Sequence, residues 1–221
     1  MFVWTGDGPP RGTPGTDGGW MELWNHVGMR YHRHPDGRLS PLGQPNVDTG
    51  MGLERLEMVL GGHRTVFEGE ALAPWVGGGR DVWGLRDAPL RLVADHLRAA
   101  VVVVGDGVRP SNTGRGYVLR RLLRRALTAL WRDDDSRTLS DLPTGVVRHT
   151  LDGFGQPDTV DEVCDVLSTE QRRFRELLRR GRPVVARRRS RGPLSDEDYR
   201  DLHDTHGLPR DLVDGLLAEA G

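Results

Sequence analysis

The chain has 221 residues, of which 36% are hydrophobic, and its 31 basic and 32 acidic side chains leave a formal net charge of −1. This length suits one large domain or two small ones, and no apolar run approaches the ~20 residues that a membrane-spanning helix needs. A single cysteine, Cys164, excludes an internal disulfide bond, so we expect a protein of the reducing cytoplasm. The lack of a long apolar run leads us to expect no membrane partner.

The N-terminal part is expected to be a strand hairpin followed by a short helix. Residues 21–33 alternate apolar and polar side chains, which indicates a strand, and the turn signal at residues 34–37 favours a hairpin. A short strand is expected over residues 45–52. The leucine spacing of residues 53–60 then predicts a helix that ends at Gly61.

The middle of the chain carries the expected domain boundary. Residues 61–88 predict irregular structure, with Gly77–Gly79 as a joint between a first domain of residues 1–88 and a second of residues 89–221. The second domain predicts mostly helix. Helices are expected over residues 90–104, 115–131 and 159–180 and in one or two short pieces between residues 194 and 220, with loops at residues 105–114 and at the basic segment 187–191.

The helix expected from residue 115 is basic on one face. Its spacing gathers Val118 and six Leu or Ala residues on one side, and Arg120, Arg121, Arg124 and Arg125 on the other. Arginine presents planar forks that suit phosphate oxygens. A plain solvated helix face is the alternative, and for this helix taken alone the two readings are evenly balanced.

The loop before this helix shifts the balance toward nucleic acid. Ser111 or Asn112 can cap the helix, and a helix N-terminus, here followed by Arg115, favours an anion. The chain has no Lys and only three Asn, so an Asn at this point is informative. Because its amide both donates and accepts, Asn112 can read a base edge in the shallow minor groove of RNA.

A second motif runs from Asp48 to Arg55. An Asp leaves a strand, Gly50 and Gly52 allow a close backbone approach, and an Arg follows in the first turn of a helix. This layout can hold an ammonium group at the Asp and a polyphosphate at the Arg. The alternative is a plain strand-to-helix turn with Arg55 in a surface ion pair.

Two weaker signals complete the candidates. Trp24 and Asn25 are either an aromatic anchor on a strand or part of a small-molecule pocket. His203 and His206 flank Asp204 at a spacing that only weakly suggests a metal, so no metal site is expected and Asp204 is interpreted as a polar contact.

Taken together, these segments resemble the alanyl-tRNA synthetase family, a class II aminoacyl-tRNA synthetase. They follow the family's order and span nearly the whole chain. The matching stretches are residues 22–25, 47–55, 92–98, 107–121 and 202–209.

The resemblance implies an α+β fold, with a partial class II antiparallel sheet followed by a mostly helical tRNA-recognition domain. It implies that Arg55 is catalytic and contacts ATP phosphate, and that Gly50 and Gly52 line the nucleotide site. It also implies that Asp48 holds the amino group of alanine. Trp24 and Asn25 become residues of the amino-acid pocket.

For the second domain the resemblance implies binding of the acceptor stem of tRNA(Ala). Asn112 and Asp204 are similar to the pair that reads the G·U wobble pair of this tRNA. Contacts to the stem are expected from Arg115, Arg120, Arg121, Arg124 and Arg125. The implied reaction is the ATP-dependent attachment of alanine to tRNA(Ala), with ATP and Mg²⁺ as cofactors. No zinc is expected, because the editing domain of the family is absent.

The chain also departs from the family. The first and second motifs of class II catalysis lie before its first residue in the family, so we expect the chain alone to be inactive as an alanine–tRNA ligase. Residues 61–76 match poorly, and Thr113 stands where the family often has an acid. The alternatives are a non-catalytic stand-alone tRNA(Ala)-binding module and a subunit whose partner chain supplies the missing motifs.

Overall fold

The computed structural model describes residues 1–219, and the chain forms two compact units that divide between Pro74 and Trp75. The fold is α+β, as the sequence predicted. Residues 220 and 221, the end of the expected second domain and of its last helix, lie outside the described residues.

The strands all belong to the first unit. In chain order they are β1 (Phe2–Trp4), β2 (Trp20–Glu22), β3 (Trp24–Arg33) and β4 (Leu39–Met51). The helices follow: α1 (Leu53–Leu60), η1 (Val66–Glu68), α2 (Ala73–Trp83), α3 (Asp87–Gly105), α4 (Gly114–Leu130), η2 (Leu139–Asp141), α5 (Thr144–Gly153), η3 (Pro157–Thr159), α6 (Val160–Arg189), α7 (Asp196–His206) and α8 (Arg210–Glu219).

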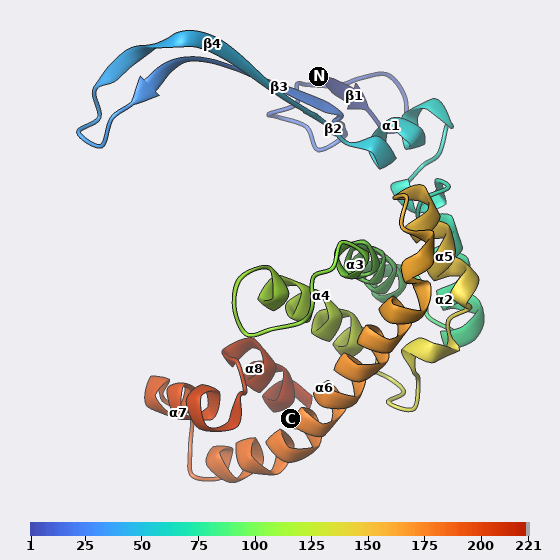
Figure 1. Cartoon of the computed structure of the whole chain (residues 1–221), viewed down its shortest axis with the longest axis vertical. Helices are drawn as coiled ribbons and strands as arrows, with labels where there is room; N and C mark the ends of the chain where they lie inside the picture. Colours follow the sequence, from blue (N-terminus) through green and yellow to red (C-terminus); the bar gives the residue numbers. More distant parts are fainter. Residues whose placement is uncertain (220–221) are drawn as a thin grey trace. The chain divides into compact units, whose positions relative to one another are not determined.

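The first unit is built on a long antiparallel hairpin. Strands β3 and β4 pair from Trp24 opposite Met51 to Arg33 opposite Leu39, and β1 pairs with β2 in a second, smaller sheet (Figure 1). The predicted turn is confirmed: Gly37 has a positive φ of 83°, which a glycine adopts without steric cost. Strand β4 is longer than expected, because pairing with β3 resumes at Tyr31 opposite Pro41 after an irregularity between Met29 and Tyr31.

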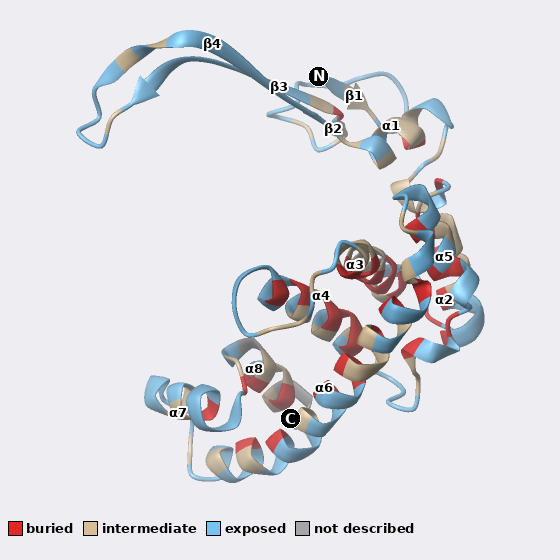
Figure 2. Ribbon diagram, viewed as in Figure 1, coloured by how far each residue is buried: buried red, intermediate tan, exposed pale blue. Residues whose placement is uncertain are grey.

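Burial in this unit is sparse. Most of β3 and β4 is exposed on both faces (Figure 2). Of the apolar side chains described in residues 1–74, only Leu23, Met58 and Leu72 are buried. The helix predicted over residues 53–60 is confirmed as α1, and it contributes Met58 to this small buried set.

The second unit is helical and has a real core. One cluster of buried side chains joins α2, α3, α4, α5 and the first half of α6, and a second joins the end of α6 to α7 and α8. These two clusters appear as the buried faces of the helices in Figure 2. The helices predicted at residues 90–104, 115–131 and beyond residue 194 are confirmed within a few residues. Helix α5 was not expected.

The glycine run at residues 77–79 is not a joint but the middle of α2. A Cβ on Gly79 would lie 2.8 Å from the side chain of Leu90, and one on Gly78 would lie 3.0 Å from Leu142. These glycines therefore let α2 approach its neighbours closely. Residues 75–88, expected in the first domain, lie in the second compact unit, with Trp75 and Trp83 in its core. A boundary of function at residue 88 stays a prediction.

The basic segment at residues 187–191 was also wrongly expected to be a loop. Helix α6 continues through Pro183 to Arg189. Proline removes a backbone hydrogen bond from a helix interior, so packing has to compensate for that loss. It does so around Gly181, where an added Cβ would lie 2.7 Å from Leu208, and at Val185, which is 2% exposed.

Within the described residues, none of the helices combines the length and the apolar character that crossing a membrane would demand.

Candidate functional site

The residues that are candidates for binding the amino acid lie on the hairpin of the first unit. Asn25 faces Gly50 across the two strands, and Val27 faces Asp48. Directly opposed residues point to the same face of a sheet, as do residues two apart on a strand. Asn25 and Asp48 therefore share one face as diagonal neighbours, a relation that brings two side chains to roughly 7–8 Å. Both are exposed.

Trp24 points to the other face of the hairpin. It lies opposite Met51, and its indole Nε1 donates a hydrogen bond of 2.6 Å to Thr49 Oγ1. Its ring also packs against His26, with 4.6 Å between ring centroids. The structure thus joins Asn25 with Asp48 but leaves Trp24 in a separate aromatic and hydroxyl cluster.

Arg55 lies in the first turn of α1, as the motif requires. Its guanidinium Nη1 donates a hydrogen bond of 2.6 Å to the backbone carbonyl of Glu22. A Cβ on Gly52 would lie 3.1 Å from the Arg55 Cδ, so this glycine gives the arginine room. At Gly50 an added Cβ would meet no atom within 4 Å, so packing within the chain does not require a glycine there. Gly50 lies directly opposite Asn25 in the hairpin.

The loop before α4 is held by one arginine of that helix. Arg120 donates from Nη1 to the side-chain oxygen of Asn112 and from Nη2 to the backbone carbonyl of Pro110 at 3.2 Å. Asn112 itself is exposed. The N-cap of α4 is Thr113, whose side chain makes no capping hydrogen bond, so the expectation that Ser111 or Asn112 caps the helix is wrong. Arg120 replaces that cap as the anchor of the loop.

Arg120 is anchored in turn by a buried acid on α6. The carboxylate of Glu170, which is 1% exposed, lies 3.1 Å from Arg120 Nε and 3.3 Å from Arg124 Nε. The guanidinium of Arg124 also lies over the ring of Phe174, 5.2 Å from its centroid. A buried carboxylate is tolerated only when opposite charges meet it, and here two do.

The four-arginine face expected on α4 is therefore divided. Arg120 and Arg124 point toward α6, with side chains only 16% and 22% exposed. Arg121 and Arg125 are exposed, as is Arg115 in the first turn. Val118 was expected on the apolar side, yet it is 56% exposed.

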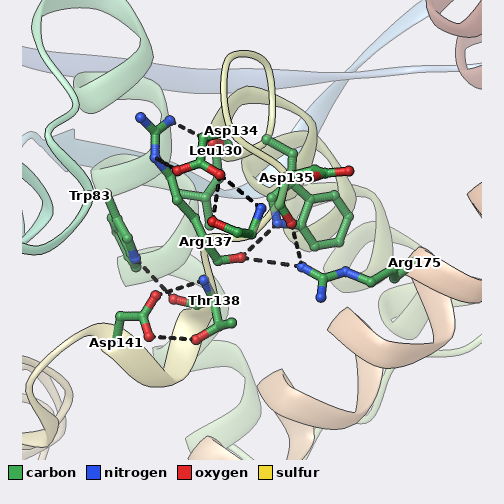
Figure 3. A network of polar contacts seen from close by, with 10 residues as sticks. Trp83, Leu130, Asp134, Asp135, Arg137, Thr138, Asp141 and Arg175 are labelled. Carbon is green, nitrogen blue, oxygen red and sulfur yellow. Dashed lines mark hydrogen bonds and ion pairs between the residues drawn. The ribbon is translucent and has the colours of Figure 1, made fainter.

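The far end of α4 is fixed by a separate polar network (Figure 3). Arg137 donates to the carbonyl of Leu130 at 3.0 Å, and Trp83 donates to the carbonyl of Thr138 at 2.9 Å. Arg175 of α6 donates to the carbonyl of Asp135 at 2.8 Å. Helix α4 is thus held at both ends, which makes it a rigid support for its exposed arginines.

Asp204 lies on α7, exposed, with its carboxylate 2.9 Å from His203 Nδ1. Helix α7 is fastened to α6 through Arg188, which bonds to Asp198 at 2.7 Å and also to Asp201. The Ser195 backbone and hydroxyl, followed by Arg188, lower the pKa of Asp198 to about 2. Helices α4 and α7 both contact α6, and both lie on the same side of it in the view of Figure 1.

Sequence reasoning missed Glu170. A signal was present, because Val163, Leu167, Glu170 and Phe174 recur at the spacing of one helix face, and one carboxylate in an otherwise apolar stripe needs a partner. Its partners lie on another helix, 46 residues from Glu170 in the case of Arg124, so only the fold reveals them.

Comparison with known families now defines the class. A family model described as tRNA synthetases class II (A) matches residues 3–221. The chain therefore belongs to the class II (A) tRNA synthetase family.

The curated relatives specify the amino acid that each of them attaches. The chain is 39% identical to the alanine–tRNA ligase of Stenotrophomonas maltophilia strain K279a over 96% of its own length and 25% of that protein. The figures are 40%, 97% and 25% for the alanine–tRNA ligase of Xanthomonas axonopodis pv. citri. For that of Desulforudis audaxviator they are 38%, 91% and 25%. The chain thus spans about a quarter of the length of these relatives.

Proposed function

We propose that the helical unit binds the acceptor stem of tRNA(Ala) and reads its G·U wobble pair through Asn112 and Asp204. The observation that carries this is the loop geometry: a buried Glu170 holds Arg120, and Arg120 holds the side-chain oxygen of Asn112. An exposed amide fixed in this way has little rotamer freedom left to lose on binding.

The chemistry of the two side chains is complementary. With its oxygen bonded to Arg120, Asn112 has its NH₂ group as a donor, which suits the acceptors of the minor groove. The carboxylate of Asp204 is an acceptor, which suits the amino group that guanine presents there. Arg115, Arg121 and Arg125 supply exposed charge for the phosphates beside the pair.

Binding to acceptor-stem hairpins tests this role. Asn112→Ala should weaken binding of the G·U hairpin by about 10-fold, or about 1.4 kcal/mol, which lies within the roughly 1–3 kcal/mol of a good base contact, and should leave a G·C hairpin almost unchanged. Arg120→Lys should act in the same direction, because an ammonium cannot reproduce the fork that Arg120 uses. Arg121→Gln is the control and should weaken both hairpins equally. Equal losses for Asn112→Ala on the two hairpins would contradict base reading.

For the first unit we propose the amino-acid and ATP contacts of the aminoacylation reaction. Asp48 would hold the ammonium group of alanine, with Asn25 beside it, and Arg55 would bind ATP phosphate next to Gly50 and Gly52. Catalysis of this kind depends on positioning and on charge stabilisation. Mg²⁺ would arrive on the ATP phosphates. Among residues 1–219, no three His, Cys, Asp or Glu form a group that could hold a metal ion.

A second candidate is a non-catalytic tRNA(Ala)-binding module, or a subunit that works with a partner chain carrying the rest of the catalytic site. The sparse burial of the first unit favours it, because Asp48 and Asn25 stand on an open hairpin surface rather than in an enclosed pocket. Alanine-dependent exchange of pyrophosphate into ATP separates the two. Exchange by the purified chain would refute the non-catalytic candidate, and exchange only on addition of another chain would support the subunit. Either role suits the cytoplasm, where tRNA is charged.

A further inference from the structure

Helix α6 is strongly polarised in charge. Residues 161–170 contain four acids and no arginine, whereas residues 172–191 contain ten arginines and one acid, Glu176. The sequence alone suggested a helix followed by a basic loop. The structure instead makes nearly all of this segment one continuous helix that reaches Arg189, so its arginines have a defined geometry.

Four of these arginines form one exposed face. Arg172, Arg179, Arg180 and Arg187 recur at intervals of seven and eight residues, which puts them along one side of a helix. We call them the arginine face. All four are exposed, and Arg179 and Arg180 are 72% and 67% exposed at the side chain. The buried residues of this half of α6, such as Phe174 and Val185, lie on the other side.

Contacts inside the fold do not neutralise the arginine face, since Arg172 donates only to the uncharged Thr169 hydroxyl at 3.1 Å among the contacts described for it. Other arginines of the segment have a structural role: Arg175 holds the loop after α4, and Arg188 fastens α7. On the arginine face Glu176 is shared by Arg179 at 2.8 Å and Arg180 at 3.3 Å, so one carboxylate meets two guanidinium groups. The face retains a net positive charge.

The helix dipole does not explain it either. A dipole favours cations only within the last turn of a helix. Arg187 lies in that turn, but Arg172, Arg179 and Arg180 lie two to four turns earlier. Repulsion between like charges along a face opposes folding, so an external polyanion is the natural counterpart.

We propose that the arginine face binds the sugar–phosphate backbone of RNA, as a contact surface separate from the exposed face of α4. From Arg172 to Arg187 a helix rises roughly 22 Å, a distance over which a strand presents several phosphates. Guanidinium forks suit phosphate oxygens. A membrane surface is disfavoured, because the large apolar side chains of this half of α6 face the two cores.

The proposal rests on the proposed function only in taking tRNA as the RNA, and a matched pair of variants of the full chain tests it. Arg172→Gln with Arg187→Gln removes two charges from the arginine face. Arg80→Gln with Arg148→Gln removes two exposed charges from α2 and α5 of the same unit. Binding of full-length tRNA(Ala) is measured from 50 to 300 mM salt, with circular dichroism to show that each variant folds.

Loss of the two contacts should weaken binding by roughly 10- to 30-fold at moderate salt and should flatten the slope of log K against log salt by about 1.4 to 1.8. The α2/α5 variant should bind like the unaltered chain, and Arg172→Lys with Arg187→Lys should retain most of the slope.

Equal losses in the two Gln variants, no loss in either, or stronger binding to anionic vesicles than to RNA would overturn the proposal. Preference for a G·U over a G·C stem is the separate readout of the proposed function. If that preference survives while the slope is unchanged, only the arginine face is refuted. If it is absent while the slope flattens, only the base-reading role is.

Discussion

The two units of this chain differ most in how they support their candidate residues. In the first unit Asn25 and Asp48 stand on a two-stranded hairpin that is exposed along most of its length. In the second, Asn112 stands on a loop that is tied through Arg120 to Glu170, a carboxylate buried in a helical core. The candidate side chains of the first unit thus lie on an open surface, whereas Asn112 in the second unit is held in place by a buried ion pair.

Because of this difference, one of the two proposed activities can be present without the other. A binding constellation works when neighbouring contacts lock its side chains. Asn112, a proposed RNA contact, meets this condition within the chain through Arg120. Asn25 and Asp48, the residues proposed to bind the amino acid, lie on one face of the hairpin. Their unit has few buried apolar side chains to hold them in place: Leu23, Met58 and Leu72 among those described.

Stability should respond most strongly to a substitution in the core of the helical unit and least to one on the exposed hairpin. Leu123 is 0% exposed in the helical unit, so Leu123→Ala should lower the free energy of unfolding by about 2–5 kcal/mol, from lost burial and an unfilled cavity. Val47 is 74% exposed on the hairpin, and Val47→Ala should change it by less than about 0.5 kcal/mol. Urea denaturation followed by circular dichroism measures both. A cost of Val47→Ala comparable with that of Leu123→Ala would show that the hairpin is buried against something in solution.

A smaller effect tests how the loop that carries Asn112 is supported. Removing one partner of a buried ion pair costs roughly 3–5 kcal/mol, and the partial exposure of both arginines should reduce this to about 2 kcal/mol for Glu170→Gln. Binding should also lose preference for the G·U stem, because Arg120 is released. Glu162→Gln is the matched control on the same helix. It pairs with Arg109, is 58% exposed, and should cost less than about 1 kcal/mol with the preference intact.

An equal loss of unfolding free energy in the two variants would mean that the burial of Glu170 does not hold the loop of Asn112 in place. Retained preference in a folded Glu170→Gln protein would separate stability from recognition.

The smallest effect distinguishes the end of the helical unit from its centre. The pKa of Asp198 is lowered from 3.8 to about 2 by Ser195 and Arg188. A carboxylate whose pKa is lower in the folded chain stabilises the fold at any pH above the pKa that it has in the unfolded chain. That contribution is lost as the pH falls from about 4 to about 2. Unfolding of α7 should therefore begin in this window. Hydrogen exchange at pH 5, 4 and 3 measures it. In Asp198→Asn the protection of α7 should be lower at pH 5 and should change less with pH, and an unchanged pH profile would exclude this carboxylate as the cause.

Much of the fold follows from local sequence signals. The hairpin turn at Gly37 needs a residue that tolerates positive φ, and the capping residues Ser195 and Gly207 mark both ends of α7. Leucine periodicity predicts α1 and α4 within a residue or two. These signals act between neighbours in the chain, so no tertiary structure is needed to see them.

The site was predictable in part. Residue type and order proposed roles for Asn112, Asp48 and Arg55 that stay predictions, and the strand register adds that Asn25 and Asp48 share a face. The same reasoning treated the arginines of α4 as one group. Helical spacing does not show which side of a polar face meets another helix. The contact with Glu170 of α6 turns Arg120 and Arg124 inward, whereas Arg121 and Arg125 stay exposed.

Periodicity and short motifs encode local geometry, so they were enough to predict the α+β class, the family and the positions of most helices. Three features follow only from packing: Gly77–Gly79 lie within a helix, α6 continues through Pro183, and Glu170 is buried against two arginines. Each depends on contacts between residues far apart in the chain. Packing and charge pairing at such contacts outweigh the local preferences of glycine, proline and glutamate.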